Sequence, residues 1–508
     1  MKNGIAIQRL AHFAQSQPQA LALKAHDGEL TYGELWQEVQ ALRARMRKSI
    51  AQLPQHIGLL TGDDRATYVA LLAILAEGKT YVPLNAQHPA DRHSVILEDA
   101  EIELVLVSRQ AVALIDALEQ KPGCKRLEVK LGEATPIVEF PPVPVTESNR
   151  AYILYTSGST GKPKGVPIHY AQLDAFLHMK LESGLYAFSA EDKFLQMFEL
   201  TFDLSVMCTL LPLCVGASVW VVRRSEGMLY LNVLDMLEAG PVTVALMVPS
   251  ILAYLQPYFA EIQLPELRLS LFCGEALPHQ LALGWSGCTP NAQIENVYGP
   301  TEATIYCSRY VWQRDGAEQE SVNGVVPIGV ALPGMHLAVV DEQGELIQDG
   351  QSGELVLYGP QVTTGYWNNE EKTTAAFHQW PHIWPHGPVY RTGDRAHRNS
   401  KGNFVYEGRL DTQVKVDGFR VELGEIEHHI RTFTQTACAV LAVEAGKTTT
   451  LHAFVERFTQ ERSAELQGYL QSKLPPYMLP RQFHFLPLLP LNSNGKVDRP
   501  QLRNLLSP

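Results

Sequence analysis

Short runs of apolar, β-prone residues recur along the first half of the chain, and segments with helical periodicity separate them. The segment ATYVALLAILAEG at 66–78 is one such helical pattern. Apolar runs this short are typical of strands buried on both faces, as in a parallel sheet covered by helices. The alternation predicts an α/β layer architecture. The runs lie at 56–60, 104–108, 151–156, 218–222, 242–248 and 269–273.

The pattern changes after about residue 325. Shorter strand-like segments and turns follow, such as GELVLYG at 353–359, and they predict an added β-rich subdomain. A small α/β unit follows, in which GEIEHHIRTF at 424–433 is predicted to be helical. We therefore expect a large N-terminal domain of parallel α/β layers over residues 1–410 and a small C-terminal α/β domain over residues 411–508.

Composition excludes several classes of function. The net charge is -12 at pH 7, and an acidic field repels nucleic acid and anionic lipid. Polar residues interrupt the N-terminus before a signal-peptide core forms, and no run reaches the roughly 18 apolar residues of a membrane span. The 7 cysteines include no C-x-x-C pair, so neither a disulfide framework nor a structural zinc site is predicted. We expect a cytoplasmic protein without nucleic-acid binding or membrane insertion.

The segment YTSGSTGKPKG at 155–165 follows an apolar run, so it forms a loop at the C-terminal end of a strand, where open α/β sheets bind ligands. Its glycines expose backbone N–H groups, and its hydroxyls and lysines add donors and positive charge. This donor set favours a polyphosphate, with a flexible surface turn as the alternative. The spacing before Gly161, and Pro163 after it, argue against a Walker A loop. The candidate phosphate-binding residues are Thr156, Ser157, Gly158, Ser159, Thr160, Gly161 and Lys162.

Further motifs follow along nearly the whole chain. Together with the loop, they resemble those of the adenylate-forming superfamily, which includes acyl and aminoacyl adenylating enzymes, acyl-CoA ligases and luciferases. The resemblance implies that the chain binds ATP and Mg2+ and converts a carboxylate into an acyl adenylate. The motifs are LTYGEL (30–35), YVPLNAQHPADR (81–92), FDLSV (202–206), NVYGPTEATIYC (296–307), GELVLYGPQVTTGYW (353–367), YRTGD (390–394), GRLDTQVKVDGFRVELGEIE (408–427) and LPLNSNGKVDR (489–499).

Residues of these motifs have side chains that suit ATP. The ring of Tyr298 offers a flat face for a purine, Glu302 offers a hard oxygen for Mg2+, and Asp394 can accept hydrogen bonds from a ribose diol. By resemblance, Thr301 contacts the α-phosphate and Arg409 lies near the ribose and phosphate. Without this context, a lone glutamate or arginine is more often a solvated surface charge.

Lys496 lies in the turn-rich stretch LNSNGKVD. A cation that bridges the carboxylate and the α-phosphate stabilises the charge that builds up during attack on phosphorus. The resemblance gives this catalytic role to Lys496, although a lysine near a terminus is more often a solvated charge. It also implies that the C-terminal domain is mobile. That domain would rotate about a hinge at Asp411, so that the loop at 416–418 replaces Lys496 for thioester formation.

Asp203, in FDLSV, occupies the position where amino-acid-activating members pair a carboxylate with the substrate's ammonium group. Placing a carboxylate beside an apolar pocket costs free energy unless a cation pairs with it. Asp203 therefore favours an amino acid over a fatty or aryl acid, with a capping or solvated aspartate as the alternative. The other pocket positions, assigned by resemblance, are Leu204, Met207, Leu246, Leu271, Cys273, Gly274, Val297, Ile305 and Tyr306.

Bulky side chains at Met207, Leu246, Leu271 and Tyr306 leave little volume beyond the substrate's α-carbon. A larger substrate would be excluded by overpacking, which costs about 1–3 kcal/mol. Alanine differs from glycine only by the small binding free energy of about one methyl group. We therefore expect glycine as the first substrate and alanine as the second. The chain resembles stand-alone D-alanine–carrier protein ligases, and especially glycine–carrier protein ligases that serve lipid A glycylation.

The chain contains no second motif set for a carrier or condensation domain, so we expect a separate, phosphopantetheinylated carrier protein to supply the acceptor thiol. Three alternatives remain. An acyl-CoA ligase of a small carboxylic acid would lack the ammonium anchor, and a luciferase-like oxidoreductase would share the fold. A non-enzymatic interaction protein would be expected to have lost Lys496 or Glu302, and both are present.

Overall fold

The chain divides into two compact units in the computed structural model. The large unit comprises residues 1–86, 99–154 and 165–410, and the small unit comprises residues 87–98, 155–164 and 411–508. The structure describes residues 4–108, 123–133, 140–158, 162–224, 228–411, 413–445, 448–490 and 497–506.

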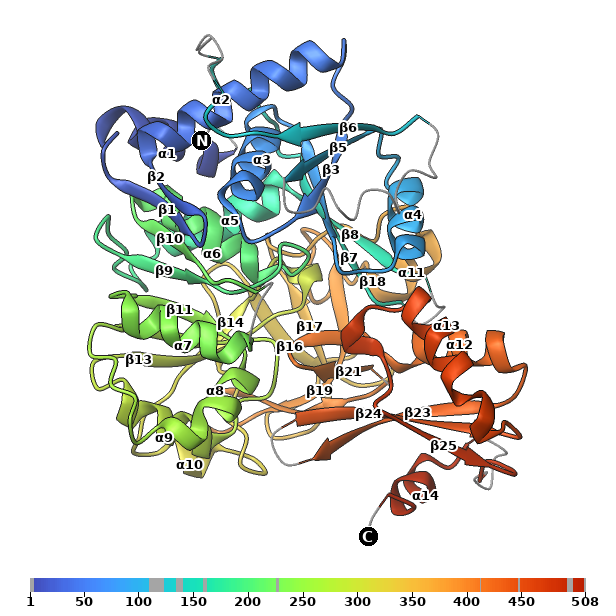
Figure 1. Cartoon of the computed structure of the whole chain (residues 1–508). Coiled ribbons are helices and arrows are strands. Elements are labelled where there is room, and N and C mark those ends of the chain that lie inside the picture. The colour runs from blue at the N-terminus through green and yellow to red at the C-terminus, as the bar shows by residue number, and fades with distance from the viewer. Residues whose placement is uncertain are drawn as a thin grey trace. The chain divides into compact units, whose positions relative to one another are not determined.

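The first sheet of the large unit is mixed but mainly parallel (Figure 1). Its antiparallel members, β2, β14 and β15, lie at the two edges. The strand order is β15 (Val330–Ala331), β14 (Ser308–Val311), β13 (Gln293–Tyr298), β12 (Leu269–Phe272), β11 (Val244–Met247), β9 (Lys193–Gln196), β10 (Ser218–Val221), β1 (Leu21–Ala25) and β2 (Gly28–Thr31).

A second sheet contains parallel pairs formed by the apolar runs near the N-terminus. Its order is β6 (Lys125–Val129), β5 (Leu104–Ser108), β3 (His56–Thr61), β4 (Thr80–Asn85), β7 (Arg150–Thr156) and β8 (Lys164–His169). A third, antiparallel sheet contains β16 (His336–Val340), β17 (Gly353–Tyr358), β19 (Val389–Arg398) and β18 (Phe377–His378), with β20 (Phe404–Arg409) paired to β19.

Helices of the large unit begin and end at residues with identifiable capping roles. Thr31 and Glu34 form a capping box at the start of α2. Asp64 accepts the Thr67 N–H at the start of α3, and Gly216 ends α6 in the left-handed region. The helices are α1 (Ile5–Ser16), α2 (Tyr32–Ser49), α3 (Arg65–Ala76), α5 (Tyr170–Glu182), α6 (Leu204–Val215), α7 (Leu229–Ala239), α8 (Pro249–Leu255), η2 (Gln256–Tyr258), α9 (His279–Cys288), η3 (Thr301–Ala303), α10 (Ala317–Glu320) and α11 (Glu370–Ala376).

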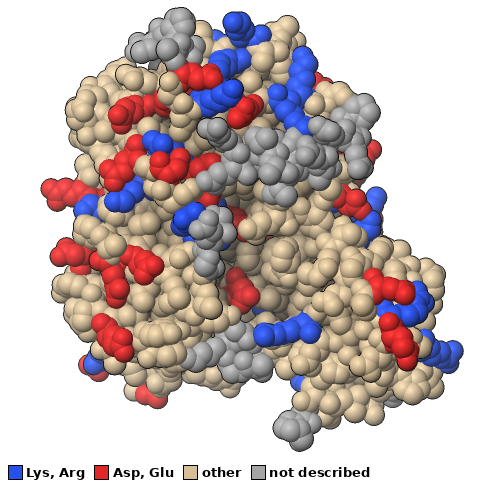
Figure 2. All heavy atoms as spheres, in the orientation of Figure 1, with Lys and Arg blue, Asp and Glu red and all other residues tan. Residues whose placement is uncertain are grey.

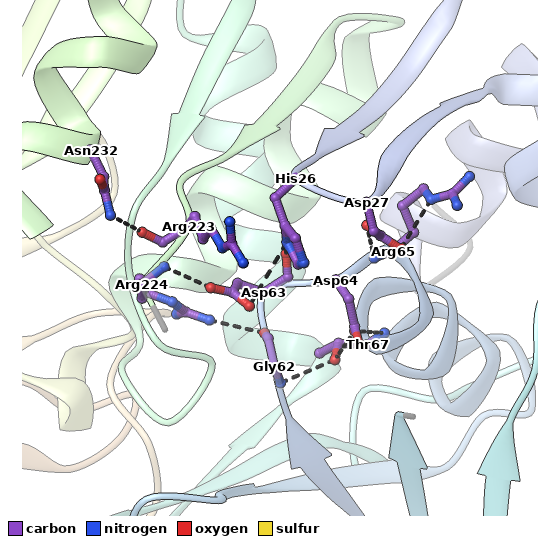
Figure 3. A network of polar contacts seen from close by, with 10 residues as sticks. All are labelled: His26, Asp27, Gly62, Asp63, Asp64, Arg65, Thr67, Arg223, Arg224 and Asn232. Carbon is purple, nitrogen blue, oxygen red and sulfur yellow. Dashed lines mark hydrogen bonds and ion pairs between the residues drawn. The ribbon is translucent and has the colours of Figure 1, made fainter. Parts of the chain in front are cut away.

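A partly buried polar network joins the ends of β3 and β10, which belong to different sheets (Figure 3). The Asp63 carboxylate accepts the Arg224 backbone N–H at 2.6 Å. The Arg224 guanidinium donates to the Gly62 carbonyl at 2.9 Å, and His26 Nδ1 lies 3.1 Å from the Asp63 carbonyl oxygen. These bonds hold the C-terminal ends of strands from two sheets together, at the edge where α/β sheets carry their ligands. We call this set the Asp63 network.

The small unit has an apolar core of its own. Val421, Ile426 and Ile430 pack there with Leu466 and Leu470, and all five side chains are buried. Its elements are α4 (Ala90–Asp99), the hairpin of β21 (Gln413–Val416) and β22 (Phe419–Glu422), α12 (Leu423–Thr434), the sheet of β23 (Cys438–Ala445), β24 (Thr448–Glu456) and β25 (Gln482–Leu486), η4 (Gln460–Arg462), α13 (Ser463–Lys473), η5 (Pro476–Met478) and α14 (Arg499–Asn504).

The predicted fold class is confirmed. Each of the apolar runs became a strand, and the pattern at 66–78 became α3. The sequence did not indicate that these strands divide between two sheets. Among the described residues, no helix combines the length and apolarity needed to cross a bilayer. On the face drawn in Figure 2, acidic and basic side chains are interspersed.

Candidate functional site

Three residues predicted to bind ATP lie together in the large unit. Tyr298 ends β13, and its hydroxyl donates a hydrogen bond to Asp394 of β19. Arg409 of β20 lies opposite Asp394 in the antiparallel ladder, with its Nη1 2.7 Å from Asp394 Oδ1. Burial and the Asp394 carboxylate raise the pKa of Tyr298, so this hydroxyl stays protonated at neutral pH. The cluster presents an aromatic ring, a carboxylate acceptor and a guanidinium together, as a nucleoside phosphate requires.

Glu302 lies in η3, and its side chain is completely buried. Tyr366 Oη donates to Glu302 Oε1 at 2.8 Å, and the Thr363 N–H donates to the Glu302 carbonyl at 2.9 Å. Each carboxylate oxygen can accept more than one bond. Mg2+ is usually bound by one or two carboxylates, substrate phosphates and water. Glu302 therefore fits as a protein ligand for Mg2+, and Tyr366 orients it.

The turn after η3 carries a strained backbone. Thr304 has φ 55° and Ile305 has φ 77°, in a region that branched side chains rarely adopt. A Cβ at position 299 would lie 2.3 Å from the Tyr306 Cα, so only glycine fits there. Gln361 Nε2 donates to the Tyr306 carbonyl at 3.0 Å and so helps to hold the turn. Sequence reasoning missed Gln361, although it lies within the motif at 353–367.

Asp203 lies at the N-terminus of α6, and only 4% of its surface is exposed. It holds the N-cap position, yet its side chain accepts no hydrogen bond from the described first turn of the helix. Helix capping, the alternative role, therefore does not describe it. Burial raises the pKa of Tyr81 and Tyr152, and the nearby Asp203 carboxylate adds to both shifts. An ammonium group at this carboxylate would form a charge-assisted hydrogen bond in a low-dielectric setting.

The predicted pocket residues on the strands share one face of the first sheet. Leu246 of β11 is in parallel register with Leu271 of β12, which is in register with Glu295 of β13. Because residues two apart on a strand face the same side, Val297 lies on that face as well. Gly274 follows β12 with φ 89°. The buried predicted pocket side chains are Asp203, Leu204, Met207, Leu246, Leu271, Cys273, Val297, Ile305 and Tyr306.

Tyr306 packs against residues of α5 that the motifs did not indicate. Its ring centroid is 5.3 Å from that of Phe176, in an edge-on contact. The Nζ atom of Lys180 is 3.9 Å from the Tyr306 ring centroid. Lys180 follows Phe176 by four residues, so the two share a helix face. This spacing is the signal by which sequence reasoning could have found Lys180.

The described part of the phosphate loop makes its polar contacts within the small unit. The Ser157 hydroxyl donates to the Arg420 carbonyl at 2.8 Å, and the Gly158 N–H donates to Glu425 Oε2 at 3.0 Å. Glu425 also pairs with Arg92 at 2.9 Å. The Gly158 N–H, which is predicted to bind phosphate, thus donates to the Glu425 carboxylate, which is also an anion. Lys162 is exposed, and Ser159, Thr160 and Gly161 lie outside the described residues.

The remaining predicted residues are placed as follows. Thr301 begins η3, and Thr156 ends β7 with a buried hydroxyl that has no hydrogen-bond partner among the described residues. Asp411 Oδ1 accepts the Gln413 N–H at 3.0 Å. Lys496 lies outside the described residues, so its role stays a prediction.

Comparisons with known proteins identify the family of the chain. The AMP-binding enzyme family matches residues 10–367. A D-alanine–D-alanyl carrier protein ligase of Bacillus licheniformis is 33% identical, over 98% of both chains. The crystal structure of the Vibrio cholerae adenylation domain AlmE, in complex with glycyl-adenosine-5'-phosphate, is 29% identical with a TM-score of 0.84, covering 100% of this chain and 98% of that one. Holo-PA1221, which contains adenylation and PCP domains, is 25% identical with a TM-score of 0.83, covering 98% of this chain and 84% of that one. The chain belongs to the AMP-binding enzymes of the adenylate-forming superfamily.

Proposed function

We propose that this chain is an AMP-forming amino acid–carrier protein ligase. It activates a small amino acid, glycine first and alanine second, with ATP and Mg2+. It then transfers the aminoacyl group to the phosphopantetheine thiol of a separate carrier protein. The observation that carries this proposal is Asp203, a carboxylate buried at the N-terminus of α6 beside the predicted pocket residues Leu204 and Met207. An ammonium group is the natural partner of such a carboxylate.

In the first step, a carboxylate oxygen of the amino acid attacks the α-phosphorus of ATP, and the bond to pyrophosphate breaks. Asp203 holds the ammonium group, while Tyr298, Asp394 and Arg409 hold the nucleoside. Glu302 would hold Mg2+, which neutralises charge on the phosphates when bound. Orientation and electrostatic stabilisation do most of the work in such a transfer.

Lys496 and the phosphate loop would supply the remaining positive charge and donors for the first step. Lys496 would bridge the attacking carboxylate and the α-phosphate. Gly158 and its neighbours would hold the leaving pyrophosphate through backbone N–H groups. These roles rest on the motifs. The role of Gly158 is also supported by its N–H, which donates to the Glu425 carboxylate, an anionic group of this chain.

In the second step, the carrier's sulfur attacks the carbonyl carbon of the aminoacyl adenylate and AMP leaves. We propose that residues 1–410 are the adenylation core and that residues 411–508 form a lid that rotates at Asp411 between the steps. The carrier proteins named in the ligase relative and in the PA1221 structure support a partner of this kind. We propose the cytoplasm as its location and lipid A glycylation as the use of the loaded carrier.

The order of substrates rests on the pocket walls. Tyr306 and the leucines of β11 and β12 are fully buried, so little volume is left past the α-carbon of a bound amino acid. One relative is a D-alanine ligase and the other holds a glycyl adenylate. The names of both relatives refer to small amino acids. The large Tyr306 ring leaves little space for a methyl group, which supports glycine over alanine.

Amino-acid-dependent pyrophosphate exchange tests the proposal. The panel contains glycine, both enantiomers of alanine, serine, leucine, phenylalanine, acetate and benzoate. We expect the highest kcat/KM for glycine, with alanine next. Activity with acetate or benzoate alone would replace the proposal with an acyl-CoA ligase. A preference for leucine or phenylalanine would leave the adenylation chemistry standing but refute the pocket assignment.

A further inference from the structure

Lys180 is a buried ionisable side chain that the proposed chemistry does not use. It lies on α5, its surface exposure is 0%, and its Nζ has no hydrogen-bond partner among the described residues. Taking an ammonium group out of water without hydrogen bonds carries a large free-energy cost. A structural lysine would normally be paired or would reach solvent. This placement therefore calls for a specific explanation.

Three aromatic rings surround the ammonium group. Nζ lies 3.9 Å from the ring centroid of Tyr306, 4.6 Å from that of Tyr186 and 5.2 Å from that of Phe176. These distances are within the range of cation–π attraction, which is strongest when the cation is desolvated. Lys180 is thus attached mainly to ring faces, and the nearest ring belongs to a predicted pocket residue.

The neighbouring carboxylate does not require Lys180. Glu295 Oε2 accepts the Tyr186 hydroxyl at 2.7 Å, and Glu295 Oε1 lies 3.1 Å from Arg309 Nη1. Gln293 Nε2 donates to Oε1 as well. Glu295 and Arg309 already form a hydrogen-bonded ion pair, so Lys180, when protonated, adds a positive charge that Glu295 attracts and Arg309 repels.

The cluster reaches the pocket through Cys273 and Tyr306. Cys273 is a near neighbour of both side chains, since a thiolate there would raise the pKa of Lys180 and of Tyr306. Gln361 fixes the backbone of Tyr306. The Tyr306 hydroxyl interacts with the neighbouring Tyr186 hydroxyl, although it makes no hydrogen bond of regular geometry to the described residues. Phe176 and Lys180 are the groups that contact the ring itself.

We propose that Lys180 is a positioning residue that determines amino-acid specificity, because its ammonium group holds the Tyr306 ring in the orientation that limits the depth of the pocket. The inference rests on the proposed function, since it assigns Tyr306 to the substrate pocket. Lys180 does not contact the substrate. It acts through the ring. Burying Lys180 is unfavourable in free energy, and in return the pocket wall is rigid.

The test is Lys180→Met, which keeps the length of the side chain and removes the charge. We expect the alanine-to-glycine ratio of kcat/KM to rise about tenfold in pyrophosphate exchange, through the amino-acid KM rather than the ATP KM. The melting temperature should stay equal or rise. Lys24→Met is the matched control, because Lys24 lies 4.4 Å over the Trp220 ring outside the proposed site, and its ratio should not change.

Phe176→Leu is the second variant, in case Lys180→Met does not fold. It removes the ring on the other side of Tyr306, keeps the lysine and should shift the ratio in the same direction. A wild type that prefers glycine, combined with an unchanged ratio in both variants, overturns the inference. So does an equal loss of activity with every substrate together with a lower melting temperature, which indicates a purely structural role.

Two further outcomes are distinguishable. If wild type uses an amino acid with an acidic or hydroxyl side chain and Lys180→Met loses that activity, Lys180 contacts substrate directly and the positioning role is wrong. If the wild-type panel shows no activation of small amino acids, the proposed function fails before the variant is made.

Discussion

Two polar clusters of the large unit, one partly buried and one fully buried, differ in how their charged groups are paired. In the Asp63 network (Figure 3), the carboxylate accepts a backbone N–H at 2.6 Å, and the Arg224 guanidinium donates to the Gly62 carbonyl at 2.9 Å. Around Lys180, the ammonium group meets ring faces and has no hydrogen-bond partner among the described residues. The first cluster lies between strands of two sheets, and the second lies behind the proposed pocket.

The difference separates polar groups that hold the fold from those that serve a site. Buried polar groups in native proteins are almost always hydrogen-bonded, since an unpaired one costs stability. The Asp63 network follows that rule, and its removal should change stability rather than specificity. Lys180 departs from the rule, and its removal should change specificity rather than stability. Variants in each region can test this division.

The largest effect is expected at Asp203. Asp203→Ala removes the proposed partner of the substrate's ammonium group, so the amino-acid kcat/KM should fall by about a hundredfold or more. Most of the loss should appear in the amino-acid KM, with the ATP KM little changed. Pyrophosphate exchange measures both constants. Asp203→Asn is the control for shape, and an unchanged amino-acid KM in both variants would restore the acyl-CoA ligase alternative.

Asp63→Ala should change the stability of the protein and leave its substrate specificity unchanged. It leaves the partly buried Arg224 N–H without its acceptor, and we expect the free energy of unfolding to fall by about 1–2 kcal/mol. Urea unfolding measures this loss. The alanine-to-glycine ratio should stay at the wild-type value, because the hydrogen bonds described for the network include none to Tyr306 or to the leucines of β11 and β12. A changed ratio with unchanged stability would break the division between the two clusters.

Tyr306→Ala tests the pocket wall itself. Removing the ring opens space past the substrate's α-carbon, so alanine or serine should gain on glycine by about 1–3 kcal/mol in kcat/KM. The ATP KM should change little, because the nucleoside residues remain. Competitive exchange with glycine and alanine measures the shift. If glycine keeps its full advantage, a residue other than Tyr306 limits the pocket.

The fold was largely readable from the sequence, because buried strands and helices differ in length and periodicity. The runs at 104–108 and 269–273 became β5 and β12, one in each parallel sheet. Their assignment to different sheets was not readable, since strand pairing depends on long-range packing that a local pattern does not encode. The Asp63 network illustrates this, because it joins residues about 160 positions apart.

The structure brings together candidate site residues that separate motifs singled out. Asp394 and Arg409 were singled out in separate motifs, and the structure pairs them across β19 and β20. Lys180 carried no motif, and a lysine on a helix is most often a solvated charge. Its position in the apolar spacing of Leu173, Phe176 and Leu177 was the available signal. Only the structure shows that this face of the helix is buried.

The smallest predicted effect is the pH dependence that Lys180 gives to stability. Burial lowers the pKa of Lys180, with Glu295 acting against that shift and Arg309 adding to it. In the unfolded chain its pKa is about 10.4. Between the folded and unfolded pKa values, the unfolded chain holds one more proton. The free energy of unfolding therefore rises with pH in that window, by at most about 1.4 kcal/mol per pH unit.

Lys180→Met lacks this contribution, so the stability of wild type relative to the variant should rise as the pH increases toward about 10. Taking the difference cancels the other titrating groups. The same loss of a proton weakens the hold on Tyr306, so the glycine preference of wild type should decline over the same window, while that of the variant should stay flat. A constant stability difference from pH 7 to about 10 would mean that Lys180 keeps its proton. The aromatic rings would then stabilise the ammonium group enough to offset its burial, and specificity would be independent of pH.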